Sequence, residues 1–562
     1  MKLIRLWVVF LLLSSCNPQP SSIDKVIEAF KLYQNTDTDQ NWDIYDSKKV
    51  EIKHLELQSI FDQLKAVSYN KLSKADQINY DMLHLVIKDQ IDEVNYQAHL
   101  MPLNAEGGFL TGMMFRFRNF SISDEESFEK YLSLLKGLPE YLAGQKLKMQ
   151  NGLENNQFAP DLVINNSISI LKNQLVLPEE ECFLASPING LSKEKREQAL
   201  HIIREKALPA LREMNNFLEG EYASNLRKGP GIMYNPEGKK YYEARVKYFT
   251  TLDMSPEEVF KKGQAEVKRI RGEMLAIIEK VGFEGNYADF LAFLRTDPQF
   301  YSSTGEQLLK EAAWLSKKAE EILPRYFTKL PRLPFTVNPV PSAIAPNYTT
   351  GRYSGGSFDK QKPGEYWVNT YKLESRPLYV LPALTLHEAV PGHHLQISLA
   401  AELENLPDFR KNTYLSAFGE GWGLYSEYLG KEAGIYRTPY EDFGRLTYEM
   451  WRACRLVVDP GIHYFGWTRE QAVQFMAENT ALSLHEVNTE IDRYIGWPAQ
   501  AVSYKIGELK IRELRKIAEE ALGENFDIRT FHDEILKNGS IPLRSLERVI
   551  RDYIDKEKIK HT

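Results

Sequence analysis

Apolar residues recur every three or four positions along most of the chain, which is the spacing of one buried face of an α-helix. The segments with this pattern are 24–33, 56–66, 74–92, 124–150, 193–219, 255–280, 305–323, 412–430, 440–456, 468–482 and 507–521. Residues 255–258 (Ser-Pro-Glu-Glu) form a typical helix start, with a serine cap, a proline in the first turn and a glutamate three residues after the cap. Ser192 and Thr468 are further predicted caps. The pattern predicts a mainly α-helical protein.

Signals for β-strands are few and lie close together. Residues 331–346 hold five prolines, which excludes a helix there. A glycine-rich turn at residues 351–356 follows. The aromatic and β-branched stretch 365–372 is then typical of a strand. We therefore expect one small β-sheet just before residue 384.

The clearest internal boundary is the turn Gly229-Pro230-Gly231. It separates an N-terminal helical region, residues 25–230, from a second region, residues 231–562. A chain of 562 residues is long enough for two such units or for one large helical body. Both arrangements, including one continuous domain, agree with the sequence.

The N-terminus has the pattern of an export signal. A short basic start precedes the apolar run 6–13, which is too short to span a bilayer as a mature helix. Small residues directly before Cys16 resemble a bacterial lipobox, so residues 1–16 are predicted as a lipoprotein signal peptide with lipidation at Cys16. Residues 17–24 would be a tether. The alternative is an ordinary signal peptide. We expect an exported protein held in the cell envelope by its lipid, and Asn17 favours the outer membrane.

Charge and cysteine content narrow the functional classes. With 70 basic and 77 acidic residues the net charge is −7, and no local lysine/arginine block stands out, so nucleic-acid binding is not expected. No stretch after the signal is apolar enough to cross a membrane. After processing only Cys182 and Cys454 remain. Cys454 lies in a helical pattern, and we expect it to be a small buried side chain.

Candidate chemistry is concentrated in residues 384–396, Leu-Thr-Leu-His-Glu-Ala-Val-Pro-Gly-His-His-Leu-Gln. In the usual zinc motif H-E-x-x-H, two histidines four residues apart lie on one helix face. Here Pro391 occupies the fourth position after His387. On an unbroken helix His393 would point about 240° away from His387, and His394 would lie roughly 10 Å along the axis. Neither could then share an ion with His387.

Pro391 is also the residue that can deform this helix. It lacks an amide donor, its ring collides with the carbonyl of His387, and Gly392 tolerates unusual backbone angles. A bulge over residues 390–392 could bring His393 beside His387. We favour His393 as the second histidine ligand because it follows the glycine directly, with His394 as the alternative or as a supporting contact. The segment could also be the polar end of a broken helix.

A third ligand is expected from the stretch 417–425, Ala-Phe-Gly-Glu-Gly-Trp-Gly-Leu-Tyr. Glu420 lies there between glycines, which cost about 1 kcal/mol each inside a helix. Their presence suggests that another backbone, expected to be that of the His387 helix, approaches closely. Glu427 would lie on the same face as a supporting partner or an alternative ligand.

Two later segments, 452–463 and 492–505, combine arginines, tyrosines and a histidine in an apolar context. A zinc peptidase stabilises its oxyanion with the metal and a tyrosine or histidine donor. We predict Tyr504 or His463 for that role, although a structural role is as plausible for each.

Together these motifs resemble the domain of unknown function 885 family, which is placed with the zincin-like metallopeptidases of the glutamate-ligand type. H-E-A-x-P-G-H-H-x-Q matches residues 387–396, E-G-W-x-L-Y matches 420–425, and P-x-Q-A-x-S-Y matches 498–504. The resemblance spans about residues 25–555. Ala499, where a glycine is usual, is a minor departure.

The resemblance implies a large helical zincin-like fold with a small sheet next to the metal-binding helix. Residues 231–562 would form the catalytic region. The edge of the sheet, expected at residues 366–371, could pair with an extended peptide. Substrate contacts are predicted for Tyr366, Trp367, Asn369, Arg493 and Tyr494.

The predicted function is that of a zinc-dependent metallopeptidase. His387, His393 and Glu420 would hold Zn²⁺, and Glu388 would act as the general base on a metal-activated water. The alternatives are a zinc hydrolase of non-peptide amides or esters, and a non-catalytic surface lipoprotein that only binds its ligand. Glu388 argues against the second alternative, because a protein that only binds has no need of the base.

Overall fold

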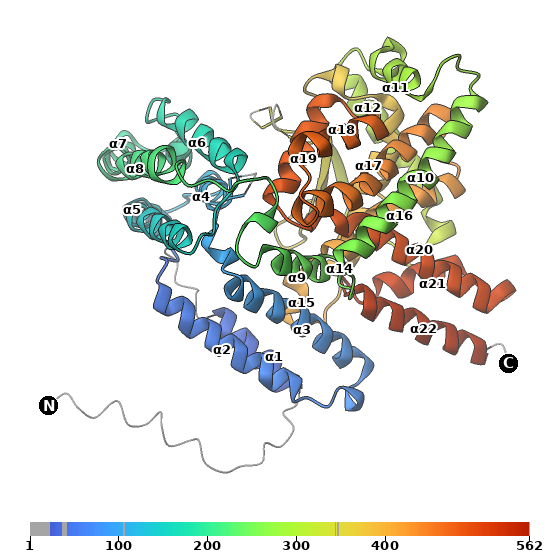
Figure 1. Cartoon of the computed structure of the whole chain (residues 1–562), viewed down its shortest axis with the longest axis horizontal. Coiled ribbons are helices and arrows are strands. Elements are labelled where there is room, and N and C mark those ends of the chain that lie inside the picture. Colours follow the sequence, from blue (N-terminus) through green and yellow to red (C-terminus); the bar gives the residue numbers. More distant parts are fainter. Residues whose placement is uncertain (1–22, 36–41, 105–106, 343, 346–347, 561–562) are drawn as a thin grey trace.

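The predicted helices are present in the computed structural model, which describes residues 23–35, 42–104, 107–342, 344–345 and 348–560 (Figure 1). The helices are α1 (Ile23–Asn35), α2 (Ser47–Lys65), α3 (Lys74–Asn95), α4 (Phe109–Arg118), α5 (Glu125–Glu154), α6 (Asp161–Leu175), α7 (Lys193–Ile202), α8 (Leu208–Phe217), α9 (Gly238–Thr250), α10 (Pro256–Lys280), α11 (Tyr287–Thr296), α12 (Gly305–Tyr326), α13 (Leu381–Glu388), α14 (His393–Ala401), α15 (Asp408–Asn412), α16 (Ser416–Glu432), α17 (Pro439–His463), α18 (Arg469–Asn479), α19 (Leu484–Gly496), α20 (Ser503–Leu522), α21 (Ile528–Leu536) and α22 (Leu543–Lys560). The strands are β1 (Phe335–Pro339), β2 (Gly351–Ser354) and β3 (Gly364–Val368). The mainly helical prediction is confirmed.

Helix starts follow the predicted capping chemistry. The Ser255 side chain accepts a hydrogen bond from the Glu258 amide, and the Glu258 carboxylate accepts one from the Ser255 amide. Thr468 forms the same reciprocal arrangement at the start of α18, and Ser192 caps α7. Such caps satisfy amides that have no partner within the helix, so these starts are determined locally.

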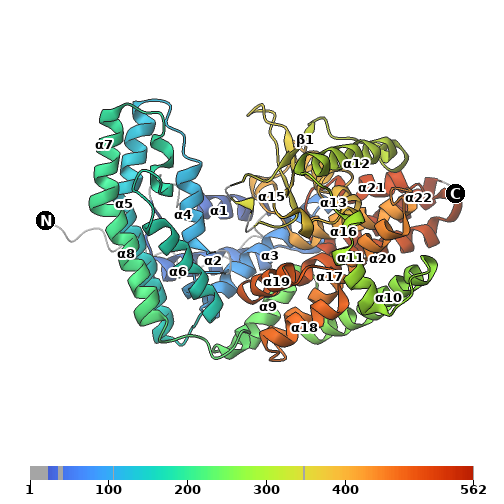
Figure 2. The ribbon, with the colours of Figure 1, turned by 90° about the horizontal axis from the view of Figure 1, so that it is seen from above.

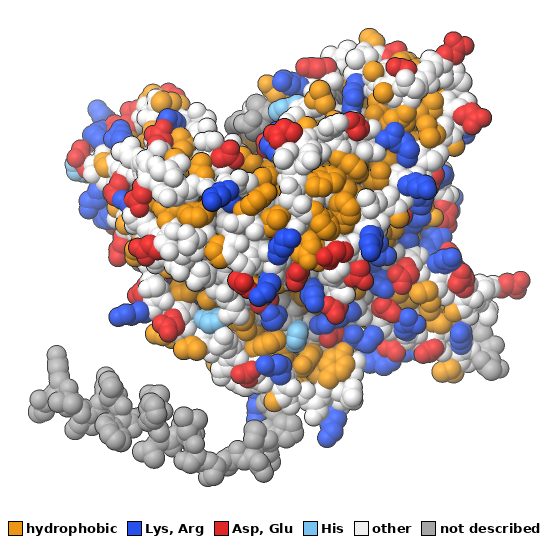
Figure 3. All heavy atoms as spheres, in the orientation of Figure 1, with side chains coloured by type: hydrophobic (Ala, Val, Ile, Leu, Met, Phe, Trp, Pro, Cys, Tyr) orange, Lys and Arg blue, Asp and Glu red, His pale blue; other side chains and the backbone are white. Residues whose placement is uncertain are grey.

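Apolar side chains gather in three clusters. One lies within α4 to α8 and is joined by Trp42; it forms the lobe at one end of the molecule in Figure 2. The second joins α1–α3 to α9, α16 and α20–α22, and the third joins α10–α12 to the sheet and α17–α19. Figure 3 shows a recess between the lobe and the rest of the molecule on this face. Helices α1–α3, which precede residue 230, share a core with α20–α22, which follow it. The proposed boundary near residue 230 therefore remains a prediction.

The sheet differs from the prediction in strand order. β3 is the central strand, with β1 parallel on one side and β2 antiparallel on the other. The predicted edge at residues 366–371 is therefore wrong, since Tyr366 and Trp367 belong to the central strand and the strand ends at Val368. β2 is an edge strand instead. A period-two pattern marks a strand but does not say which neighbours it pairs with.

Helix α17 runs through the interior and holds much of the remaining site chemistry. Its residues are buried without a break from Phe443 to His463. Cys454, on this helix, is fully buried, as predicted, and it is a free cysteine. Among the described residues we find no helix with the length and apolarity needed to cross a membrane. Cys16 and the predicted signal lie outside the described residues.

Candidate metal centre

The helix that carries His387 ends at Glu388, and a new helix begins at His393. The Ala389 amide still donates to the Thr385 carbonyl, at 2.9 Å, and the chain then folds back over the end of α13. A Cβ atom on Gly392 would lie 1.9 Å from the His387 carbonyl oxygen, so only glycine fits this return. The break predicted around Pro391 is therefore present, as a turn between two helices.

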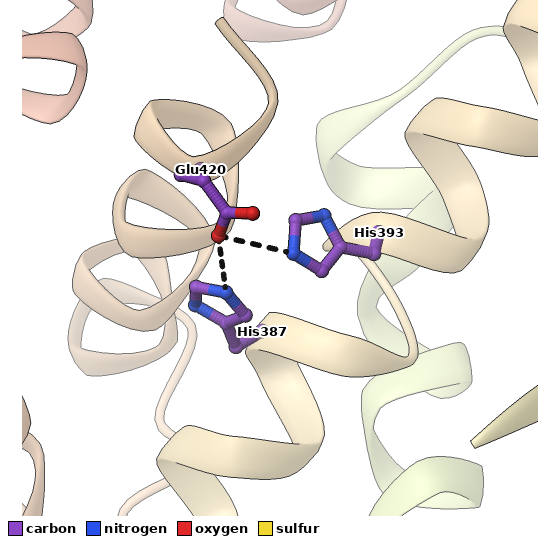
Figure 4. Close-up of side chains that lie close together, drawn as sticks. All are labelled: His387, His393 and Glu420. Carbon is purple, nitrogen blue, oxygen red and sulfur yellow. Dashed lines mark ion pairs between the residues drawn. The ribbon is translucent and has the colours of Figure 1, made fainter. Parts of the chain in front are cut away.

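This turn brings His393 beside His387, opposite Glu420 of α16 (Figure 4). Nε2 of His387 and Nε2 of His393 each lie 3.4 Å from the same Glu420 oxygen, Oε2. The three candidate ligand atoms lie within 4.8 Å of one another. Both histidines are buried, and the Glu420 side chain is 15% exposed.

Glycines of α16 allow this convergence. A Cβ atom on Gly423 would lie 2.6 Å from Cε1 of His387, so the imidazole occupies the space that a side chain would need. Gly421 packs on Gly507 of α20, with 2.6 Å between its Cβ position and the Gly507 backbone. The backbone that approaches α16 closely is therefore that of α20, at Gly421, and not that of the His387 helix. At Gly423 it is the imidazole of His387 that occupies the space.

Glu427 holds the second nitrogen of His387. The His387 Nδ1–Glu427 Oε1 distance is 2.8 Å, and Glu427 is also 3.6 Å from the Arg452 guanidinium. This hydrogen bond leaves Nε2 directed at Glu420. Burial opposes a charge on His387, but the bonds to Glu420 and Glu427 outweigh it and raise the His387 pKa to about 9. A metal ion would take the place of the proton shared by these groups.

Glu388 lies at the end of the same helix and is 8% exposed. Its Oε2 accepts a hydrogen bond from the Tyr353 amide, at 2.8 Å. That amide belongs to β2 and points away from β3, so the free edge of the sheet faces the site. The bond orients one carboxylate oxygen of the predicted base and leaves the other available.

His394 faces the sheet. Its Nδ1 lies 3.0 Å from the Tyr353 hydroxyl and 3.3 Å from the Ser398 hydroxyl, and its ring packs on Phe335 of β1. Burial lowers its pKa to about 4 in spite of a backbone hydrogen bond at Leu333 that acts in the opposite direction. It is therefore neutral, and it ties α14 to the sheet instead of joining His387 and His393.

A tyrosine that the sequence analysis did not single out reaches the site. The Tyr414 hydroxyl donates to Oε1 of Glu420 at 3.2 Å, and it interacts electrostatically with Tyr504. A Cβ atom on Gly419 would lie 2.1 Å from that hydroxyl, so the glycine before Glu420 was the available signal. Tyr504 itself is partly exposed, and the Arg455 guanidinium lies 4.3 Å from its ring centroid.

His463 lies in a separate buried network. Its Nδ1 accepts from the Ile232 amide at 3.0 Å, so its Nε2 carries the proton donated to the Tyr494 carbonyl at 2.9 Å. Burial lowers its pKa to about 3. Because both ring nitrogens hold backbone groups, this geometry favours a structural role, and Tyr504 is the better candidate for the oxyanion donor.

Most of the predicted substrate contacts have internal roles. Tyr366 is fully buried with its hydroxyl 3.3 Å from that of Thr385, and Asn369, also fully buried, donates to three carbonyls of the loop before β2. The buried Tyr494 hydroxyl donates to Glu490. These three predictions conflict with the structure because the side chains point into the protein. Trp367 and Arg493 remain partly exposed.

Two of the three ligand separations suit a tetrahedral zinc ion. Zinc–nitrogen and zinc–oxygen bonds of about 2.0–2.2 Å place neighbouring ligands of a tetrahedron about 3.3–3.6 Å apart. The two 3.4 Å separations between the histidine nitrogens and Glu420 agree with that spacing. Two imidazoles and a carboxylate leave the fourth position for water or substrate, as in catalytic zinc sites.

Comparison with known proteins agrees with the motif resemblance. The model of the family described as "Bacterial protein of unknown function (DUF885)" matches residues 29–550. The chain belongs to the DUF885 family. No curated protein matches this DUF885 chain.

Solved structures with the same fold include two described as putative lipoproteins. The protein from Colwellia psychrerythraea is 28% identical with a TM-score of 0.87, over 95% of this chain and 99% of that one. The protein of unknown function from Shewanella oneidensis is 18% identical with a TM-score of 0.73, over 94% of this chain and 100% of that one.

One departure from the DUF885 motifs has a structural correlate. Ala499, where the motif resemblance leads us to expect a glycine, has a φ of 67°, in the left-handed region that glycine adopts without strain. Its amide donates to the buried Asp459 carboxylate at 3.0 Å. The alanine therefore retains the glycine-like conformation of this turn.

Proposed function

We propose that this protein is a zinc-dependent metallopeptidase with the zincin type of mechanism. The observation that carries the proposal is the convergence of His387, His393 and Glu420, with Glu420 3.4 Å from a nitrogen of each histidine and Glu388 next to His387 at the end of α13. Four groups of the right chemistry are thus held together by packing. A bound zinc ion supplies Lewis acidity, which activates water and polarises the scissile carbonyl.

Glu388 is the general base in this proposal. One of its oxygens is held by the Tyr353 amide, and the other accepts the proton of the attacking water. The water oxygen bonds to the carbonyl carbon, the carbon–nitrogen bond breaks, and Glu388 passes the proton to the leaving amine. Tyr504 donates a hydrogen bond to the carbonyl oxygen as negative charge develops there.

The position of β2 supports an extended peptide as substrate. β2 is an edge strand, and its Tyr353 amide reaches the general base. A peptide added along this edge would use main-chain hydrogen bonds for affinity and would place a backbone carbonyl near Glu388.

We also propose that the protein is exported and anchored through Cys16. The lipobox pattern supports this, and so does the description of both structural neighbours as putative lipoproteins. The mature chain would then act at a membrane surface within the cell envelope.

The test is Glu388→Gln, measured by peptide-library cleavage and by elemental analysis. We expect the variant to retain zinc while turnover falls by at least about 100-fold, the low end for a general base. A variant with wild-type activity would contradict the assignment of the base. Cleavage of esters but no peptide by the wild-type protein would favour the non-peptide hydrolase, and binding without hydrolysis would favour the binding protein.

A further inference from the structure

Three arginines lie next to the metal centre on the side of Tyr504. Arg452 is 3.6 Å from Glu427, the partner of His387. The Arg455 guanidinium is 4.3 Å from the Tyr504 ring centroid, and Arg493 also interacts electrostatically with Tyr504. Arg452 thus contacts the carboxylate that orients His387, and Arg455 and Arg493 lie beside Tyr504, the proposed oxyanion donor.

The carboxylates near this cluster also have other partners. Glu490 is shared, because Arg455 and Arg493 both lie 3.1 Å from its Oε2. Glu427 is engaged by His387. The next carboxylate, Glu486, accepts a hydrogen bond from Thr350, and burial raises its pKa. Asp459 also interacts electrostatically with Arg455 and Arg493, but it accepts hydrogen bonds from Tyr242 and from the Ala499 amide, and burial raises its pKa to about 7.

Two arginine nitrogens have no hydrogen-bond partner among the described residues. They are Nη1 of Arg455 and Nε of Arg452, which belong to residues only 2% and 5% exposed. A buried donor of a charged group without a partner is costly. These donors point to an anionic partner that completes the cluster.

A second buried ion cluster shows the contrast. Lys505 is fully buried on α20, and its Nζ lies 2.8 Å from Glu449, 2.7 Å from Glu508 and 3.2 Å from Glu266. Each cation contact there is met by a carboxylate of this chain, so that cluster stabilises the helix packing without any ligand. In the arginine cluster, by contrast, Arg455 and Arg493 share one carboxylate, and Nε of Arg452 and Nη1 of Arg455 have no partner among the described residues.

The chemistry of the cluster suits a carboxylate. Guanidinium groups bind carboxylates through paired hydrogen bonds, and stacking on aromatic rings fixes their planes. Arg455 lies 4.4 Å from the Trp451 ring centroid as well as against Tyr504, and Arg452 lies 4.3 Å from Trp451. The Arg493 side chain is 18% exposed, so this end of the cluster meets solvent.

We propose that Arg452, Arg455 and Arg493 bind the C-terminal carboxylate of the peptide substrate. The inference rests on the proposed peptidase function and makes it an exopeptidase that removes one or a few residues from the C-terminus. Because the cluster adjoins the metal ligands, the carboxylate it holds would belong to a residue close to the scissile bond. A long internal peptide segment would leave the cluster unpaired.

The experiment compares one N-blocked tripeptide as a free acid and as its C-terminal amide. With the zinc-loaded wild-type protein we expect kcat/KM to be roughly 10- to 100-fold lower for the amide, the range for lost hydrogen bonds to a charged group. The second readout is calorimetric binding of both peptides to Glu388→Gln protein, where the same preference is expected. A peptide amide with a glutamate side chain at its end tests whether any carboxylate suffices.

Arg493→Gln should lower free-acid binding about 10-fold and leave amide binding unchanged. Arg469→Gln is the matched control, because Arg469 pairs with Asp492, the residue before Arg493, on the adjoining helix. Equal wild-type cleavage and binding of acid and amide would overturn the inference while the peptidase function stands. The inference would also be overturned if Arg493→Gln weakened the binding of the free acid and of the amide equally, or if the peptide amide with a terminal glutamate bound as strongly as the free acid. Retained free-acid preference without any hydrolysis would support the carboxylate site and refute the peptidase function.

Discussion

Substituting Gly423 with alanine tests the metal centre without touching a ligand. The added Cβ would lie 2.6 Å from Cε1 of His387 and 2.8 Å from both ring nitrogens. Nonbonded carbon atoms prefer about 3.5–4.0 Å, so the ring must retreat by about 1 Å. Metal–ligand distances are held within about 0.2 Å. His387 therefore cannot accommodate the methyl group and keep its position in the site.

The retreat would also break the 2.8 Å bond between Nδ1 and Glu427. Loss of such a supporting bond alone weakens metal binding about 10- to 100-fold, and displacement of the ligand adds to this. We expect Gly423→Ala to lose at least about 100-fold in zinc affinity. The fold should survive, because a gain of about 1 kcal/mol in helix propensity offsets part of an overpacking cost of about 1–3 kcal/mol.

The assay is zinc content after dialysis against buffers of defined free zinc, together with urea unfolding of the metal-free protein. Gly272→Ala is the control, because Gly272 lies inside α10 and its Cβ position has no neighbour within 4 Å. We expect that variant to bind zinc normally and to gain about 1 kcal/mol in stability. Normal zinc affinity in a folded Gly423→Ala protein would refute the proposed ligand geometry.

Two further predictions concern the histidines. His393→Gln should lose zinc. His394→Gln should retain zinc and lose activity about 10-fold, because the hydrogen bonds of His394 orient the strand whose Tyr353 amide holds Glu388. Elemental analysis and turnover measurements separate the two variants, and zinc loss in the His394 variant alone would reverse the assignment. In metal-free protein, the rise of the His387 pKa from 6.5 to about 9 stabilises the fold fully below pH 6.5, and this stabilisation is lost as the pH rises through 9. The free energy of unfolding measured in urea should fall by up to about 3 kcal/mol over this pH range in metal-free protein but not in zinc-loaded protein. Matching pH profiles for the two forms would contradict this prediction.

Most helices could be predicted from short stretches of the sequence. Amphipathic segments and their caps, such as Ser255 with Glu258, can be read from neighbouring residues alone. α13 is expected only from the His-Glu motif and not from periodicity, because all eight of its residues are buried and a helix that is buried all round has no apolar stripe. α22 does carry such a stripe, from Leu543 to Ile554, so that helix was within reach of the same reasoning.

The candidate ligands could be predicted because their signals are local. Pro391 and Gly392 mark the turn, and the glycines around Glu420 mark a crowded helix. The remaining parts of the site depend on contacts far apart in sequence. The Tyr353 amide reaches Glu388 across 35 positions, and the order of the strands decides that this amide is free to do so.

The paired histidines explain why the motif departs from H-E-x-x-H. Adjacent residues on a helix point about 100° apart. At the start of α14, His393 consequently faces Glu420 while His394 faces Tyr353 of β2. In a regular H-E-x-x-H helix the second histidine lies on the same face as the first, and the motif provides no adjacent histidine that could contact the sheet as His394 does. The turn at Pro391 thus lets one short segment hold both the metal ligand and the strand that orients the base, so displacement of α14 would disturb metal binding and proton transfer together.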